Sequence, residues 1–303
     1  MNEDGEHVAG VTGVLKSIGL AIRTVKPTRV IVVFDGKGGS TSRKKVFSGY
    51  KEGREKNKLR VNRQYADMMN EEDERTSMKR QYVWLSDMID HLPMTTMMYD
   101  GIEADDVMAY IATDLLKEDE QAVLMSTDKD FLQLVNDTTI VWSPTKKKIY
   151  NKQTIKEEFG LESKNLLLYR VLDGDVSDRI PGVKGVGLKT LLKRIPEISG
   201  EEQMQVSDLL RLAEEKRGKI RIYDTILESK EQILMNEKLM QLKSTTMING
   251  ISKMKILDLY NEELKPVNKM NFFKVCMKYK VINNMGDINK WLHTTFSNLI
   301  TEK

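Results

Sequence analysis

The stretch Arg29-Val-Ile-Val-Val-Phe-Asp35 decides the fold, because it joins an unbroken apolar run to a terminal carboxylate. A short run rich in β-branched residues favours a strand that is buried on both faces, as in a parallel sheet. Residues 12–25, just before it, carry apolar side chains at helical spacing. The sequence therefore predicts a surface helix followed by a buried strand that ends in Asp35.

The same alternation continues along the chain. Further strands are expected at 94–99, 122–126 and 138–142, and helices are expected at 71–92, 103–117 and 131–135. This order predicts an α/β fold with a mainly parallel sheet flanked by helices. After Tyr150 only helical spacing remains, at 154–159, 165–172, 188–194, 203–216, 224–243 and 268–281. We therefore expect an α/β core over residues 1–150 and a helical region over 151–303.

The composition excludes several classes of protein. The chain has 303 residues, three His and a single Cys, Cys276, which excludes an internal disulfide framework and a cysteine-rich zinc site. No apolar run approaches the ~20 residues of a membrane span. The first residues show no basic and apolar leader, so we expect a cytoplasmic protein without a membrane partner.

Positive charge is concentrated in one segment. Residues 37–64 hold ten Lys and Arg against Glu52 and Glu55, which gives a net charge of +8, whereas the whole chain carries +3. Such a segment predicts binding of a polyanion, and a solvated basic loop is the alternative.

Carboxylates gather where strands end. Asp35 is followed along the chain by Tyr99-Asp-Gly-Ile-Glu-Ala-Asp-Asp106, Ser126-Thr-Asp-Lys-Asp130 and Asp173-Gly-Asp-Val-Ser-Asp178. The carboxyl ends of parallel strands share one edge of a sheet, so we expect these groups to converge. Clustered carboxylates repel one another, and oxygen ligands favour Mg²⁺ or Mn²⁺. Two such ions ~4 Å apart promote phosphodiester cleavage. For any single acid, a helix cap is the competing interpretation.

Three of these motifs resemble successive signatures of the 5′-nucleases of the flap-endonuclease superfamily, over residues 10–192. They are Gly101-Ile-Glu-Ala-Asp-Asp106, Ser126-Thr-Asp-Lys-Asp-Phe131 and Gly174-Asp-Val-Ser-Asp-Arg-Ile-Pro-Gly-Val-Lys-Gly-Val-Gly187. The resemblance implies that one divalent ion lies near Asp35, Glu103, Asp105 and Asp106. It implies a second ion near Asp128, Asp130, Asp175 and Asp178.

The basic segment and the glycine-rich loop share this resemblance. Tyr50-Lys-Glu-Gly-Arg54 is similar to the Tyr-Lys-x-x-Arg stretch of the helical arch in these enzymes. This implies that Lys51 and Arg54 face the scissile phosphate, with Arg43, Lys44 and Tyr50 also contacting DNA. The loop at 182–187 resembles a helix–turn–helix module. It implies contacts with duplex DNA, and a K⁺ ion held by carbonyls, at Gly182, Lys184, Gly185, Gly187 and Lys189.

The resemblance implies a Mg²⁺-dependent, structure-specific 5′→3′ exonuclease and flap endonuclease of bacterial or bacteriophage type, with Mn²⁺ as a substitute ion. Its expected substrates are flapped DNA and RNA–DNA hybrids in replication, which includes ribonuclease H activity. The expected partners are a single-stranded-DNA-binding protein or a sliding clamp, and the expected state is a monomer.

One departure from the family leaves alternatives open. The family begins with a central strand that ends in an Asp ligand, and no such strand precedes residue 12. Either Met1 is an internal methionine, or the protein lacks that strand and binds its first ion weakly. The second case would suit a catalytically impaired DNA-binding protein. A small endoribonuclease of the related PIN type is a further rival, although it would lack the basic arch and the glycine-rich loop.

Overall fold

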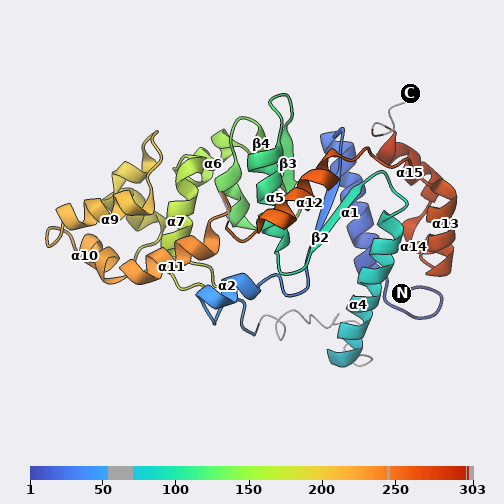
Figure 1. The fold of residues 1–303 in the computed structure, drawn as a ribbon, viewed down its shortest axis with the longest axis horizontal. Helices are drawn as coiled ribbons and strands as arrows, with labels where there is room; N and C mark the ends of the chain where they lie inside the picture. The colour runs from blue at the N-terminus through green and yellow to red at the C-terminus, as the bar shows by residue number, and fades with distance from the viewer. Residues whose placement is uncertain (54–70, 244–245, 298, 300–303) are drawn as a thin grey trace. The chain divides into compact units, whose positions relative to one another are not determined.

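The computed structural model describes residues 1–53, 71–243, 246–297 and 299 (Figure 1). Helices and strands alternate in its first half, which confirms the predicted α/β class. The chain divides into two compact units. The first comprises Met1–Phe34, Glu55–Met97 and Met254–Lys303, and the second comprises Asp35–Arg54 and Met98–Lys253. The change from strands to helices near residue 150 therefore lies inside the second unit.

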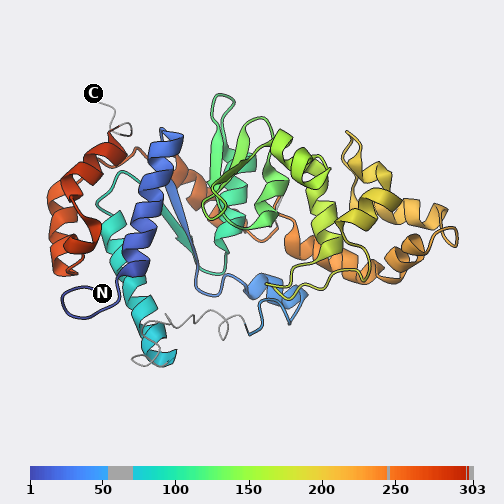
Figure 2. The ribbon, with the colours of Figure 1, turned by 180° about the vertical axis from the view of Figure 1, so that it is seen from behind.

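The first unit is mostly helical. Buried side chains of Val11, Leu15 and Ile22 face the core from one side of its first helix. This helix contacts the helices at 71–89, 282–285 and 288–296. Gly19 allows a close approach, since a Cβ there would lie 2.7 Å from Nε1 of Trp291. Figure 2 shows this first helix beside the first strand. The elements are α1 (Ala9–Val25), β1 (Ile31–Asp35), α4 (Glu71–Ile89), β2 (Thr95–Tyr99), α12 (Gly250–Asn261), α13 (Lys269–Lys278), α14 (Ile282–Met285) and α15 (Ile288–Phe296).

The second unit contains a three-stranded sheet, and the part of the chain that follows this sheet is helical. Its elements run from α2 (Thr41–Val46) and α5 (Ala104–Tyr110) through the π-helical turn η1 (Ile111–Leu115), β3 (Ala122–Met125), η2 (Lys129–Leu134), β4 (Thr139–Ser143) and β5 (Lys148–Tyr150). They then continue as α6 (Lys152–Phe159), η3 (Ser163–Asn165), α7 (Leu166–Asp173), α8 (Leu188–Arg194), η4 (Pro196–Ser199), α9 (Val206–Glu215), α10 (Arg221–Glu228) and α11 (Lys230–Met240). Here η2, η3 and η4 are 3₁₀ helices.

The sheet differs from the mainly parallel one that the sequence predicts. In the described residues β1 and β2 form a two-stranded sheet, and β3, β4 and β5 form a second sheet. β3 pairs with β4 in parallel, with Ala122 opposite Thr139. β4 pairs with β5 antiparallel, with Val141 opposite Tyr150. The four residues between β4 and β5 are too few for a parallel crossover, so β5 must return antiparallel.

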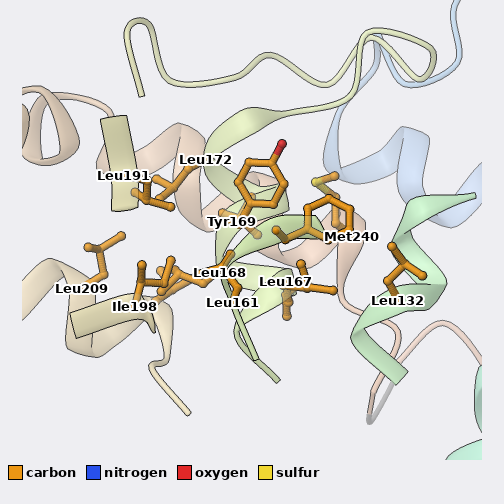
Figure 3. Packing of buried hydrophobic residues seen from close by; sticks show 14 of the residues in the cluster. Leu132, Leu161, Leu167, Leu168, Tyr169, Leu172, Leu191, Ile198, Leu209 and Met240 are labelled. Atoms are coloured by element: carbon orange, nitrogen blue, oxygen red, sulfur yellow. The ribbon is translucent and has the colours of Figure 1, made fainter. Parts of the chain in front are cut away.

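The core of the second unit lies around α7 (Figure 3). This helix is apolar nearly all round and is buried from Leu166 to Leu172. Leu172 and Tyr169 face Leu191, Met240 and their neighbours from the surrounding helices in this view. A helix that is buried on all sides holds both of its ends in fixed places, and its carboxyl end leads directly to Asp173 and Asp175.

Several elements were not predicted. The sequence pattern does not predict α2, β5, α12, α14 or α15, and it predicts a single helix where α10 and α11 lie. The predicted basic segment reaches residue 64, but residues 54–64 lie outside the described residues, and so does Arg54. Within the described part of the chain, no helix combines the length and apolarity needed to cross a bilayer.

Candidate metal centre

A glycine at the end of β1 places Asp35 beside the second acidic group. A Cβ on Gly36 would lie 1.7 Å from the carbonyl oxygen of Tyr99, so only glycine fits at this crossing. The Gly36 amide donates to the Ile102 carbonyl at 3.1 Å. The Ala104 amide, at the start of α5, donates to Oδ1 of Asp35 at 2.9 Å. The first two acidic groups of the sequence therefore meet, as predicted.

A buried arginine joins two of these carboxylates. Nη1 of Arg43 lies 2.6 Å from Oε2 of Glu103 and 2.6 Å from Oδ2 of Asp106, and Nη2 donates to Oδ1 of Asp106 at 2.9 Å. Its Nε donates to the Leu239 carbonyl at 2.8 Å, and the residue is 3% exposed. Every arm of the guanidinium is thus engaged inside the protein. Arg43 therefore supports the acidic cluster in this structure, whereas the sequence predicts that it contacts DNA.

Tyr50 has the same supporting position. It is 3% exposed, and its hydroxyl donates to Oε2 of Glu103 at 3.1 Å. Burial, and then the negative charge of Glu103, raise the pKa of the Tyr50 hydroxyl, so it stays a donor. The sequence predicts that Tyr50 contacts DNA, whereas its hydroxyl here supports Glu103. Lys44, in contrast, is exposed.

Lys51 reaches into the site from a strained backbone position. Its φ is 54°, in the left-handed region that costs a non-glycine residue about 1–2 kcal/mol. Its amide donates to the Asp178 carbonyl at 3.0 Å, which helps to hold this conformation. The ammonium group pairs with Glu103 and lies 4.0 Å from Oδ2 of Asp178. One lysine thus links two acidic groups that are far apart in the sequence.

A second buried arginine joins the other two acidic groups. Nε of Arg170 donates to Oδ1 of Asp130 at 2.8 Å, and Nη2 donates to Oδ2 of Asp175 at 2.6 Å. Nη1 donates to the Gly174 carbonyl at 3.1 Å. The side chain is 8% exposed. Arg170 therefore fixes the loop after β3 against the loop after α7.

The loop after β3 is also fixed from within. Oδ1 of Asp128 accepts a hydrogen bond from the amide of Asp130 at 2.8 Å, which caps η2. The Asp128 amide donates to Oγ of Ser126 at 3.1 Å. Asp128 is thus a helix cap through one of its carboxylate oxygens, as the competing interpretation predicts. The negative charge of this carboxylate also acts on neighbouring carboxyl groups.

Two carboxyl groups in the cluster have raised pKa values. Burial, and then the negative charge of Asp128, raise the pKa of Asp105 to about 7, with further contributions from Glu103 and Asp35. Burial also raises the pKa of Asp130 to about 6, against the opposing charge of Arg170. The charges of Asp128, Glu103 and Asp35 therefore all act on the Asp105 carboxyl group. A proton or a cation stabilises such a cluster.

The donor set fits a hard divalent cation, although the ligands are not assembled around one. In the ranges that the structure describes, no three carboxylate, imidazole or thiol groups converge closely enough to hold a metal ion. Instead Arg43, Lys51 and Arg170 balance the negative charge. All eight predicted ligands are carboxylates, which is the chemistry of Mg²⁺ and Mn²⁺ sites.

The glycine-rich loop has a structural part and an exposed part. A Cβ on Gly182 would lie 2.1 Å from the Asp173 carbonyl, and the Val183 amide donates to the Leu172 carbonyl at 2.7 Å. Gly182 is thus required for the loop to pack against α7. The second part of the loop is exposed, at Lys184, Gly185, Gly187 and Lys189.

Arg170 is the supporting residue that the sequence analysis missed. Its signal is weak, because it is a single basic residue within an otherwise apolar helical segment. A charged side chain among Leu and Val residues indicates that it pairs with an opposite charge inside the protein rather than facing solvent. The sequence does not say which of the many acids is that partner.

Comparisons with known proteins were made for the whole chain. A family model described as "5′-3′ exonuclease, N-terminal resolvase-like domain" matches residues 1–160. The 5′-3′ exonuclease of Bacillus subtilis is 31% identical over 224 residues, which cover 73% of this chain and 69% of that protein. The 5′-3′ exonuclease of Buchnera aphidicola from Acyrthosiphon pisum is 26% identical over 275 residues, which cover 90% and 88%.

The chain also matches part of longer proteins. DNA polymerase I of Bacillus subtilis is 30% identical over 243 residues, which cover 78% of this chain and 25% of the polymerase. The chain therefore spans about a quarter of that polymerase.

Solved structures show the same fold. A T5 5′-exonuclease with bound zinc superposes with a TM-score of 0.65 at 24% identity, covering 82% of this chain and 90% of that one. A T5 flap endonuclease in complex with DNA and metal ions gives 0.60 at 21% identity, covering 88% and 91%. At this level of identity the likeness is one of fold.

Proposed function

Because the chain belongs to the 5′-3′ exonuclease and flap-endonuclease family, we propose that it is a Mg²⁺-dependent, structure-specific 5′→3′ exonuclease and flap endonuclease. Its substrates are 5′ flaps of DNA and the RNA of RNA–DNA hybrids, as they arise in replication. The observation that carries the proposal is that the negative charges of Asp128, Glu103 and Asp35 all raise the pKa of Asp105, with Lys51 in the same cluster.

The acidic cluster supplies the ligands in this proposal. Arg43 pairs with Glu103 and Asp106, and Arg170 pairs with Asp130 and Asp175. Among the described ligands this leaves Asp35, Asp105 and Asp128, while Asp178 lies near Lys51. When bound, divalent ions activate water and stabilise the leaving oxygen in phosphodiester cleavage. Arg43 and Arg170 hold the remaining carboxylates in place.

Lys51 is the candidate catalytic cation. Its ammonium group now pairs with Glu103 and is partly exposed, with 16% of its side chain accessible. A scissile phosphate next to the acidic cluster would offer Lys51 a second anionic partner. An ammonium group placed there neutralises the charge that develops on the phosphate in the transition state.

DNA contacts come from exposed parts of the second unit. The loop from Lys184 to Lys189 offers backbone amides and two lysine side chains, which suits the phosphates of duplex DNA. We propose α7, this loop and α8 as the helix–turn–helix module, with K⁺ as a ligand of its carbonyl groups. Lys44, which is exposed in the 37–64 segment, serves the single-stranded flap.

The proposal is tested with Asp128→Asn in a 5′-labelled flap cleavage assay with Mg²⁺. Asp137→Asn is the matched control, because Asp137 is exposed and its carboxylate pairs with Lys152 at the surface. Asp128→Asn should abolish cleavage and leave flap binding, measured by fluorescence anisotropy, intact or stronger. Less negative charge then faces the phosphate.

Three other results would contradict the proposal. If a folded Asp128→Asn variant cleaves flaps at a near-wild-type rate, Asp128 is not a ligand of the metal site. A wild-type chain that binds flap DNA tightly but never cleaves it would be a catalytically impaired DNA-binding protein. Cleavage of single-stranded RNA in preference to flaps would indicate a PIN-type endoribonuclease.

A further inference from the structure

Helix α13 is apolar on two opposite sides. Its inner side places Phe272, Val275 and Cys276 in the core of the first unit. Its outer side carries three large apolar residues in successive turns, with exposed fractions of 69%, 40% and 56%. We call Met270, Phe273 and Met277 the α13 stripe.

Lysines flank the stripe. Because an α-helix has 3.6 residues per turn, Lys274 and Lys278 lie along one edge of the stripe and Lys269 lies along the other edge. All three are exposed, and α13 contains no acidic residue. Lys278 contacts Asp87 at 3.3 Å, with 64% of its side chain still exposed. The outer face of α13 is therefore apolar along its centre and positively charged along its edges.

The proposed nuclease function does not use this face. The stripe lies in the first unit, whereas all described residues of the candidate metal centre lie in the second unit. It also lies outside residues 1–160, which the family model matches. Isolated exposed apolar side chains are ordinary on protein surfaces, but a contiguous row of three with a charged border is typical of an interaction site.

We propose that the α13 stripe binds an acidic segment of another protein in which apolar side chains stand between Asp or Glu residues. Methionine and aromatic side chains are enriched at the centres of protein interfaces, and methionine adapts its shape to different partners. The lysine border selects for a negatively charged partner by charge complementarity. Nucleic acid suits the lysines but not the stripe, because two of its three side chains are methionines, which offer bases no aromatic platform.

The test uses the full chain and a fluorescein-labelled peptide made of Glu, Leu and Phe residues, followed by fluorescence anisotropy. One control peptide has Gln for each Glu, and another has Ser for each Leu and Phe. Wild type should bind the first peptide at least about 10-fold more tightly than either control peptide. Phe273→Ser with Met277→Ser should weaken binding about 10-fold or more, and so should Lys269→Glu with Lys274→Glu.

Matched control variants lie on exposed positions of α1. Leu20→Ser and Lys16→Glu should leave peptide binding unchanged, because they remove one apolar and one basic side chain elsewhere on the first unit. Flap cleavage should be equal to wild type in every one of these variants. A failure of the docking proposal is thereby separated from a failure of the nuclease proposal. If the double serine variant melts early, the lysine variant carries the test.

Four outcomes overturn the proposal. In the first, wild type does not bind the acidic peptide at concentrations up to about 1 mM. In the second, it binds the Gln peptide as tightly as the acidic peptide, and in the third the α1 control variants lose as much peptide affinity as the stripe variants. In the fourth, the stripe binds another ligand. The last outcome would appear as binding of a single-stranded oligonucleotide, or of phosphatidylserine vesicles, that the serine variant loses while the peptide is not bound.

Discussion

At the scale of single residues, two glycines of one loop differ in their surroundings. A Cβ on Gly182 would lie 2.1 Å from the Asp173 carbonyl, whereas a Cβ on Gly187 would meet nothing within 4 Å. Gly182→Ala should therefore lower the free energy of unfolding by more than about 2 kcal/mol. Gly187→Ala should change it by less than about 0.5 kcal/mol. Urea denaturation of both variants measures this, and equal stability would contradict the packing described for Gly182.

Lys51 combines a functional charge with an unfavourable backbone angle. Because its φ is 54°, Lys51→Gly should be more stable than Lys51→Ala by about 1 kcal/mol. Both variants lose the ammonium group, so both should slow single-turnover flap cleavage by about 10-fold or more, which corresponds to about 1.4 kcal/mol. Thermal melts and cleavage rates separate the two effects. Lys45→Ala is the control, since Lys45 is exposed nearby, and a loss equal to that of Lys51→Ala would reduce Lys51 to a general phosphate contact.

The sequence identifies acidic residues more readily than it identifies their partners. Asp35, Glu103 and Asp105 stand out because they follow apolar runs, and local pattern is enough to place them. Arg43 is one of ten basic residues in its segment, and its partner Glu103 lies 60 positions away. Only the tertiary fold decides which of those basic residues is buried, so the role of Arg43 was not predictable.

At the scale of elements, Arg170 connects η2 to the carboxyl end of α7. Arg170→Met would leave Asp130 and Asp175 buried near each other without their shared cation. Removing one partner of a buried ion pair costs about 3–5 kcal/mol, so urea denaturation at pH 7 should show a loss of that order. Arg211→Met should cost less than about 0.5 kcal/mol, because Arg211 is 72% exposed in its pair with Asp208. Similar effects in both variants would contradict the connecting role.

Helices α4 and α13 are joined by a carboxylate that depends on pH. Oδ2 of Asp87 accepts hydrogen bonds from the Tyr279 hydroxyl at 2.6 Å and from Lys278 at 3.3 Å. The Tyr279 hydrogen bond, and then the positive charge of Lys278, hold the pKa of Asp87 below its usual range, although burial opposes this. A lowered pKa contributes stability above the ordinary value of Asp, and this stability is lost as the pH falls through the folded value.

Asp87→Asn should therefore be less stable than wild type at pH 7. At an acidic pH below the folded pKa of Asp87 the difference should shrink, because Asp87 is then protonated in both the folded and the unfolded states. Tyr279→Phe is the companion variant, since it removes the hydroxyl donor and keeps the ring that stacks on Trp84. Denaturation curves at both pH values decide the matter, and a pH-independent difference would contradict the assigned cause.

The elements themselves were largely predictable. Residues 188–194 form a helix with the bounds that their spacing predicts, and β1 lies within the apolar run that ends at Asp35. The antiparallel β5 was not predictable, because a three-residue strand carries too short a pattern to be recognised. Pairing partners of strands depend on contacts between distant segments, and periodicity does not contain them.

At the scale of the whole molecule, Mg²⁺ should raise the melting temperature. A ligand that binds only the folded state adds about 2.7 kcal/mol at 100 times its Kd. The increase should be reversed by EDTA and should be smaller in Asp128→Asn. NaCl at the same ionic strength is the control, because salt alone screens the clustered carboxylates. Identical melting curves with Mg²⁺ and with NaCl would contradict the metal centre.

The first unit joins early and late parts of the chain, and this has a consequence for protein synthesis. Nη1 of Arg23 on α1 donates to Oγ1 of Thr295 on α15 at 2.8 Å, across 272 positions of sequence. A ribosome that adds ~5–20 residues each second needs about 15–55 s to travel between them. During that time the apolar side of α1 has no α15 to pack against, while the second unit, from Met98 to Lys253, emerges as a nearly continuous segment. The nascent chain should therefore recruit a chaperone at its amino-terminal helix until the last helix leaves the exit tunnel.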